Sequence, residues 1–231
     1  MEVLGGSQTI FALTSYLARF TYNYADKYFL TANFRADGSS RFDANNRWGY
    51  FPSVSGAWRI NEEPFLRSFE TLSNLKIRAS IGQVGNQAPV RIFQYETTLG
   101  NGANYDFGND GEADIGIVEN RFPSVGIKWE TNVMRGIGID IGLWQDRLNI
   151  TADAYIRKTQ DMLTQVRIPL STGNADDSPL VNNGEVENRG FELAINYNDQ
   201  ISDLSYSVDV NFSTFQNKVT FLQNNSVFID G

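Results

Sequence analysis

The side chains best suited to chemistry in this sequence are basic residues that recur at alternate positions within apolar stretches. Lys76 and Arg78, for example, flank the apolar Ile77. The full set is Arg19, Arg35, Arg59, Lys76, Arg78 and Arg157. Because successive side chains of a β-strand point to opposite faces of its sheet, these cations share the polar face of their predicted strands. Two interpretations are open: the cations line a water-filled lumen and meet a plug or a passing solute, or they form an ordinary solvent-facing surface.

Other catalytic and ligand-binding chemistry is sparse. The 231 residues contain no histidine and no cysteine, which removes histidine-based triads, cysteine nucleophiles and the commonest zinc ligands. Glu62 and Glu63 could suggest glycoside hydrolysis, but adjacent side chains diverge. Acidic loops at 106–114 and 174–179 resemble weak cation sites, although the first has Ile117 where a calcium loop needs glutamate. We therefore predict that the protein is not an enzyme and has no catalytic, metal-binding or cofactor-binding residue.

The charge balance argues against nucleic acid as a partner. Lys and Arg total 19 against 27 Asp and Glu, for a formal net charge of -8, whereas binding to phosphate backbones needs clustered cations. The 20 glycines and 13% aromatic residues favour strands and turns over helices. The sequence has no run of roughly eighteen apolar residues, so we predict no membrane-spanning helix.

Period-two alternation predicts about eight strands, of roughly nine to twelve residues, a length that crosses a bilayer at a tilt. The predicted strands cover 16–24, 28–35, 53–60, 75–82, 136–143, 148–157, 191–197 and 204–213. Short links after Tyr24, Trp144 and Tyr197 alternate with long loops after residues 35, 82 and 157. We expect the loop 83–130 to be strand-like only around Phe93 to Thr97. This rhythm is typical of transmembrane barrels, which have short periplasmic turns and long extracellular loops.

Aromatic residues gather near the ends of the predicted strands. They are Trp48, Tyr50, Phe51, Trp129, Trp144 and Tyr197. Such residues form interfacial girdles around membrane barrels, although each one is also compatible with ordinary packing.

Four longer segments follow one another along the chain. They are YFLTANFRADGSSRFDANNRWGYFPSVSGAWRINEEPFL, LSNLKIRASIGQVGNQ, KWETNVMRGIGIDIGLWQDRLNITADAYIRKTQDML and GEVENRGFELAIN. In sequence and order they resemble the barrel region of the SusC/RagA family of TonB-dependent outer-membrane transporters of Bacteroidetes. The resemblance extends over most of the chain, from about Thr14 to Phe212.

The resemblance implies an all-β fold: an antiparallel up-and-down transmembrane β-barrel segment, which we expect to be an open curved sheet of about 8–10 strands from a larger barrel. Residues 1–231 would form a partial TonB-dependent receptor β-barrel domain, lacking the plug, TonB box and signal peptide. The parent protein would be a nutrient importer in the cell outer membrane that takes up oligosaccharides or peptides. Its partners would be outer-membrane lipid, a SusD-like lipoprotein, the glycan or peptide substrate, and TonB through the missing N-terminal part.

Three other interpretations are open. The chain could form a soluble carbohydrate-binding β-sandwich whose aromatic residues stack on sugars, a glycosidase that uses two carboxylates, or a small closed barrel of eight strands. A second sheet of the same chain lying over the apolar rows would exclude the transporter interpretation.

Overall fold

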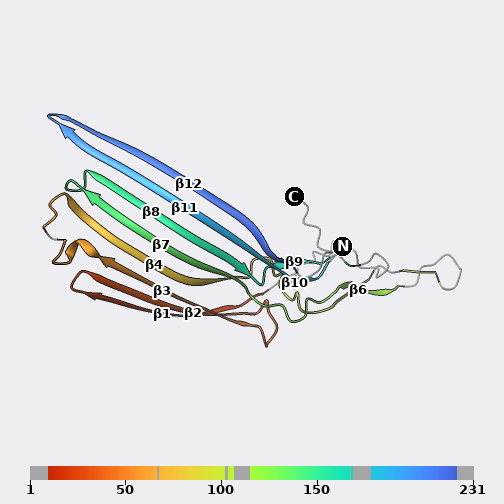
Figure 1. Ribbon diagram of the computed structural model, residues 1–231. Helices are drawn as coiled ribbons and strands as arrows, with labels where there is room; N and C mark the ends of the chain where they lie inside the picture. The colour runs from red at the N-terminus through yellow and green to blue at the C-terminus, as the bar shows by residue number, and fades with distance from the viewer. Residues whose placement is uncertain are drawn as a thin grey trace, which may run out of the picture.

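The computed structural model describes residues 10–66, 68–101, 104–106, 115–166, 168 and 178–222. Its main element is one eight-stranded sheet in the order β1-β2-β3-β4-β7-β8-β11-β12 (Figure 1). The strands are β1 (Leu13–Tyr24), β2 (Tyr28–Ser39), β3 (Trp48–Arg59), β4 (Leu72–Asn86), β7 (Glu130–Leu143), β8 (Leu148–Gln160), β11 (Gly184–Ile201) and β12 (Leu204–Leu222). Each pairs antiparallel with the next long strand along the chain, so the topology is up-and-down, as predicted.

The sheet is curved and open (Figure 1). β1 and β12 are its two edges, and they do not pair with each other. An unpaired edge presents a row of backbone N–H and C=O groups that can pair with further strands. The predicted open curved sheet is therefore confirmed, and the closed eight-stranded barrel is excluded.

Short turns join the strands at one end of the sheet, which we call the short-turn end. Ala25 and Asp26, between β1 and β2, both have positive φ, with values of 55° and 53°. Two consecutive residues of this kind form turns whose twist matches that of the flanking strands. The connection from β3 to β4 is longer and contains the 3-10 turn η1 (Ile60–Glu62). Nowhere in the described residues is there a helix long and apolar enough to cross a membrane.

The opposite end, which we call the loop end, carries two small sheets. β5 (Thr98–Asn101) pairs with β6 (Ile117–Arg121), and β9 (Leu163–Gln165) pairs with β10 (Leu180–Asn182). The alternation pattern missed both pairs. The prediction of strand character at Phe93–Thr97 was wrong, because turns occupy most of this segment and Phe93 has a φ of 56°. β11 and β12 also run further toward the loop end than predicted, because polar residues replace the apolar half of the alternation there.

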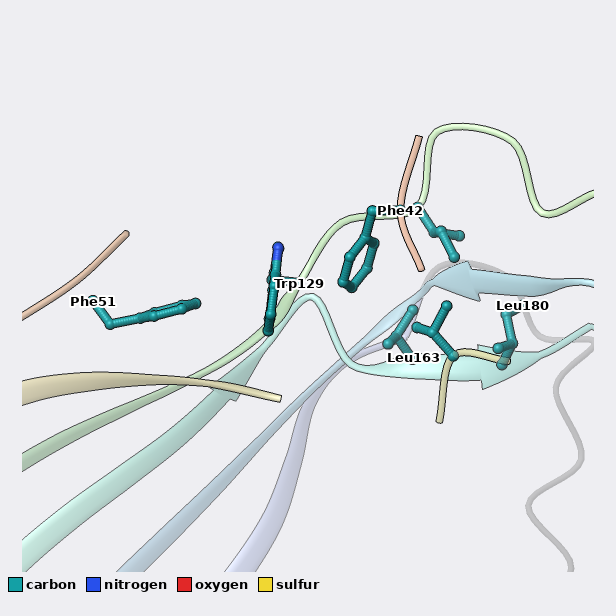
Figure 2. Close-up of a cluster of buried hydrophobic side chains, with 7 residues drawn as sticks. Phe42, Phe51, Trp129, Leu163 and Leu180 are labelled. Carbon is teal, nitrogen blue, oxygen red and sulfur yellow. The ribbon is translucent and has the colours of Figure 1, made fainter. Parts of the chain in front are cut away.

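A hydrophobic cluster connects the long loops (Figure 2). This cluster, the loop core, consists of Phe42, Phe51, Val90, Ile127, Trp129, Leu163 and Leu180. Figure 2 shows Trp129 between Phe42 and Phe51, with ring centroids 4.8 Å and 5.6 Å away. The Trp129 Nε1–H donates a hydrogen bond of 3.2 Å to the carbonyl oxygen of Arg47. The loops therefore pack against one another through buried side chains.

Candidate functional site: the two faces of the sheet

The register of the sheet assigns each residue of the eight long strands to one of two faces. One row of cross-strand partners reads Tyr28, Trp58, Ile77, Ile139, Ala152, Leu193 and Phe212. The neighbouring row on the other side reads Phe29, Ala57, Arg78, Gly138, Asp153, Glu192 and Ser213. Because the side-chain period of a strand is two, these rows define an apolar face and a polar face.

The apolar face is exposed. Phe20, Ile137 and Phe212 have exposed fractions of 59%, 60% and 55%. Among the described residues, no second layer lies over the middle of this face, because both small sheets are at the loop end (Figure 1). Apolar surface of this extent is unfavourable in water, at about 25 cal/mol per Å². The covering sheet that a β-sandwich requires is absent from the described part of the chain.

Aromatic side chains border the apolar face at both ends. At the short-turn end, successive rings 6.5, 6.3 and 6.3 Å apart belong to Tyr22, Tyr24, Tyr28 and Trp58. Toward the loop end, ring pairs 5.8 and 6.2 Å apart belong to Tyr16 with Trp48 and Phe34 with Tyr50. Aromatic rings in two such belts are typical of the two water interfaces of a membrane.

The residues predicted for aromatic girdles divide into two groups. Trp48 and Tyr50 lie at the loop-end border, while Trp144 and Tyr197 lie near the short-turn end. For Phe51 and Trp129 the alternative of ordinary packing is confirmed, because they are 6% and 7% exposed in the loop core. Phe51 lies on the polar face of β3, in register with Arg35, and Trp129 directly precedes β7.

From β3 to β12 the border of the apolar band crosses the strands obliquely. Among the described strand residues, the last aromatic side chain at the short-turn border is Trp58 on β3 and Tyr206 on β12. The cross-strand partners of Trp58 can be followed over five strand spacings to Phe212 on β12. Phe212 is six residues from Tyr206, so the aromatic border has shifted by six residues along the strands. With ~3.3 Å per residue and ~4.8 Å per strand, this shift corresponds to an angle of about 40°. Strands of transmembrane barrels are tilted by ~35–45°.

All six basic residues singled out from the sequence lie on the polar face, in two groups. Arg59 and Lys76 are direct cross-strand partners. The concavity that these two line together with Arg78 and Arg157 has a volume of about 690 Å³. A second concavity, of about 640 Å³ and nearer the loop end, is lined by Arg19 and Arg35.

Arg78 is held by two carboxylates in the first concavity. Its Nε and Nη2 donate to the two oxygens of Asp140 at 2.8 Å and 3.0 Å, and Nη2 also donates to Asp153 at 3.1 Å. Gly138 makes room for this arrangement, because a Cβ at that position would lie 2.2 Å from Asp153 Oδ1 and 2.7 Å from Arg78 Nη2. Arg78 therefore links β4, β7 and β8 across the polar face.

The other cations of the first concavity have no carboxylate partner among the residues that the structure describes. Among the described residues, Arg59, Lys76 and Arg157 form no ion pair within 4.0 Å. The Arg59 guanidinium lies 5.7 Å from the ring centroid of Phe29. Glu192 also lines this concavity. The site consequently presents positive charge that is not neutralised by the wall itself.

The cations of the second concavity are more constrained. Arg19 Nε donates to the Asn33 side-chain oxygen at 2.7 Å. Arg35 Nε forms an ion pair with Asp37 at 2.6 Å, and the Asp37 side chain is 8% exposed. Polar neighbours therefore orient both side chains along the wall.

Glu63 holds together the sheet and the β3–β4 connection at the short-turn end. Its carboxylate accepts hydrogen bonds from Tyr28 Oη at 2.6 Å, Lys27 Nζ at 3.1 Å and Trp58 Nε1 at 3.2 Å. These bonds, first that of Tyr28 and then that of Lys27, lower the pKa of Glu63 below its ordinary value. Glu62 instead accepts from Asn61. The two adjacent carboxylates thus have separate partners and do not form a paired acid and base.

In the part of the chain that the structure describes, no group of three or more potential metal ligands comes together. Residues 107–114 and 174–177, which carry most of the acidic loops noted in the sequence, lie outside the described residues.

Sequence reasoning missed the acids Asp140 and Asp153 and a set of basic residues on the apolar face. Each acid alternates with apolar residues just as the predicted cations do, so strand parity could have found both. The basic residues Arg135 and Lys158 break the apolar alternation of β7 and β8 near the loop end. A basic residue at a position of the apolar alternation was therefore the signal by which the sequence could have revealed these residues.

The curved, open, two-faced sheet defines a segment of a transmembrane β-barrel wall, and comparison with known proteins assigns its family. Residues 5–230 match the family described as "TonB dependent receptor-like, beta-barrel". The chain therefore belongs to the TonB-dependent receptor β-barrel family, which is an outer-membrane family of receptors and transporters. The resemblance to SusC/RagA transporters predicted from the sequence is confirmed.

Individual relatives agree with this assignment. TonB-dependent receptor P3 of Formosa agariphila is 37% identical over 94% of this chain and 21% of its own length. TonB-dependent receptor SusC of Bacteroides thetaiotaomicron is 34% identical over 91% of this chain and 21% of its own length. The structure of the RagAB peptide importer in its closed-closed state matches with a TM-score of 0.81 and 27% identity, over 93% of this chain and 23% of that chain. This chain thus spans about a fifth of the length of these relatives.

Proposed function

We propose that this chain forms part of the barrel wall of an outer-membrane nutrient importer of the SusC type. The observation that carries the proposal is the exposed apolar face, whose side chains suit a lipid bilayer and whose two ends are bordered by aromatic rings. The oblique course of the apolar band supports the same orientation of the strands. The unpaired edges of β1 and β12 would pair with further strands of a larger barrel.

The side chains of the six basic residues of the polar face would face the aqueous interior of that barrel. Arg59, Lys76 and Arg157 support this proposal, because they line a concavity without carboxylate partners among the described residues. They would meet anionic groups of a plug or of a passing solute. Arg78 would stabilise the wall through Asp140 and Asp153 instead.

The importer would take up oligosaccharides or peptides together with a SusD-like lipoprotein, and TonB would act through a part of the protein outside the 231 residues. Support comes from the likeness to SusC and to the RagAB peptide importer. The loop end would meet the lipoprotein, because the β5–β6 hairpin there presents Leu99, Ile115 and Ile117 at exposed fractions of 68%, 76% and 70%.

Single cysteines along β7 provide the test, because the chain has no cysteine of its own. Residues 136, 137, 139, 140 and 141 would each be replaced by cysteine in turn within the complete polypeptide, in which any cysteine outside the 231 residues is changed to serine. Each variant would be labelled with an environment-sensitive fluorophore and studied in lipid vesicles. We expect lipid-confined quenchers to reach Ile137→Cys, Ile139→Cys and Ile141→Cys. Water-soluble quenchers should reach Gly136→Cys, where an added Cβ has space, and Asp140→Cys from the polar face.

The outcome distinguishes the wall from a soluble module. Quenching by lipid at alternate positions supports the importer wall. Equal access of water to all five positions, in a protein that stays monomeric without detergent or lipid, would contradict it.

A further inference from the structure

Four basic residues interrupt the apolar face near the loop end. They are Arg135 on β7, Lys158 on β8, Arg189 on β11 and Lys218 on β12. Arg135 and Arg189 flank Ile156 in one cross-strand row, and Lys158 and Lys218 flank Glu187 in the next row toward the loops. We call these four residues the outer basic cluster.

The cluster is incompletely neutralised. Arg189 pairs with Glu187 and Lys158 pairs with Glu185, both at 2.6 Å. Among the residues that the structure describes, Arg135 and Lys218 have no carboxylate within 4.0 Å. Both side chains belong to exposed residues. The cluster therefore presents two cations to whatever covers the apolar face.

Exposed apolar side chains surround Arg135. Its cross-strand partners Ile81 and Ile156 are 48% and 38% exposed, and Ile137, next on the same face, is 60% exposed. On the side away from the loops, a hollow of about 300 Å³ has a mainly apolar lining that includes Ile137, Ala154 and Phe191, together with Asp153. Arg135 is the next residue of β7 on this face beyond Ile137, which lines the hollow. A guanidinium next to an apolar hollow matches a ligand with an anionic head and an apolar tail, because guanidinium groups bind phosphate through two parallel hydrogen bonds.

The two ends of the apolar face differ in charge. Among its described strand residues at the short-turn end, the charged group is Asp199, which pairs with Arg147 at 3.1 Å. The other border positions there are aromatic, such as Tyr28 and Trp58. Unpaired cations on this face are thus found only at the loop end of the described strands, which is the extracellular end in barrels of this architecture.

We propose that the outer basic cluster binds the phosphate-bearing headgroup of an outer-leaflet lipid, whose acyl chains lie on the apolar rows below Arg135. This proposal rests on the proposed function, since it requires the apolar face to lie in a membrane. Charge complementarity selects the occupant: Arg135 and Lys218 supply positive charge, and the hollow beside Ile137 supplies an apolar surface for a tail.

The test compares two lipids and two double variants. The complete polypeptide would be inserted into phosphatidylcholine vesicles doped with diphosphorylated lipid A or with the same lipid A after removal of its phosphates, and bound lipid A would be measured after extraction in mild detergent. We expect the wild type to retain the phosphorylated lipid. Arg135→Gln with Lys218→Gln should bind it about thirtyfold more weakly, the loss expected for two cations beside an anionic headgroup.

Lys76→Gln with Arg157→Gln is the matched control, since it removes from the opposite face two cations that have no carboxylate partner within the described part of the chain. We expect this variant to retain the phosphorylated lipid as the wild type does. Arg135→Lys keeps the charge and should retain most of the binding. If the double variant at Arg135 and Lys218 failed to insert into the vesicles, the wild type alone would test the site. The proposal requires the wild type to retain more of the phosphorylated than of the dephosphorylated lipid.

The possible failures separate the two proposals. A wild type that enters the vesicles but retains both lipids equally would overturn the lipid site alone. The same holds if the control variant lost binding as strongly as the double variant at Arg135 and Lys218. A wild type that enters neither kind of vesicle would contradict the proposed function and this site with it.

Discussion

The loop core and the apolar face use hydrophobic side chains in opposite ways. In the loop core, Phe42 and Ile127 are 0% and 2% exposed, because they are covered by residues from other loops. On the apolar face, Ile137 and Phe212 are 60% and 55% exposed, and no described residue covers them. The first region is stabilised in water by its own packing. The second depends on an apolar environment that the described chain does not supply.

The largest expected effect concerns the loop core. Phe42→Ala removes a fully buried ring that stacks on Trp129, so it should lower the free energy of opening the loop core by about 3–5 kcal/mol. Hydrogen exchange of the β9 and β10 amides measures this opening. The control is Phe34→Ala, at a 45% exposed ring on the apolar face, which should leave that exchange unchanged. Equal effects of the two variants would remove the distinction between the regions.

A charge in the middle of the apolar face should have the next largest effect, and only in a bilayer. Ile139→Arg should lower the free energy of unfolding from lipid vesicles by about 2–4 kcal/mol, because it exposes a cation to lipid near the membrane centre. Urea unfolding followed by tryptophan fluorescence measures the change. Ser80→Arg introduces the same side chain on the polar face and should cost much less. A polar-face arginine as costly as Ile139→Arg would reverse the assignment of the faces.

The Arg78 network should contribute less, because its members are partly exposed. Arg78→Met leaves Asp140 and Asp153 without their shared cation, and we expect a loss of about 1 kcal/mol in the free energy of unfolding. Arg78→Lys retains the charge but not the two-pronged contact with Asp140, so it should fall between the wild type and Arg78→Met. The urea concentrations at the midpoint of unfolding in vesicles would rank the wild type and the two variants. An Arg78→Met midpoint equal to that of the wild type would show that the network does not stabilise the wall.

The smallest expected effect is a pH dependence at the short-turn end. The pKa of Glu63 is lowered by its donors, so its stabilising contribution is present above the ordinary carboxyl pKa and is lost as the pH falls through the lowered value. The Arg59 amide donates a hydrogen bond of 2.8 Å to the Lys27 carbonyl oxygen. As the pH falls through the lowered pKa of Glu63, the hydrogen-exchange rate of this amide should rise relative to the rate expected for an unprotected amide at the same pH. Glu63→Gln should lack the transition, while the control Glu62→Gln should retain it. A transition that persists in Glu63→Gln would assign it to another group.

Much of the wall could be predicted from alternation, because the side-chain period of a strand records which face each residue occupies. Ile137 and Ile139 against Gly138 and Asp140 are sufficient to orient β7. The small strands β9 and β10 could not be predicted in this way, since each has three residues, too few to show a period. The role of Phe51 stayed open between an interfacial girdle and packing, although its position on β3, in register with Arg35, places it on the polar face, where it packs against Trp129 in the loop core.

The sequence by itself determined a sheet with one apolar and one polar face, and it indicated the transporter family. Both conclusions rest on local alternation and on similarity along the sequence, neither of which depends on contacts between distant residues. Tertiary structure alone decided which side chains meet across strands: Arg78 with Asp140 and Asp153, Glu63 with Tyr28, and Arg135 with no acid among the described residues. The physical reason is that strand register, which brings together residues up to 75 positions apart in the case of Arg78 and Asp153, depends on the whole sheet.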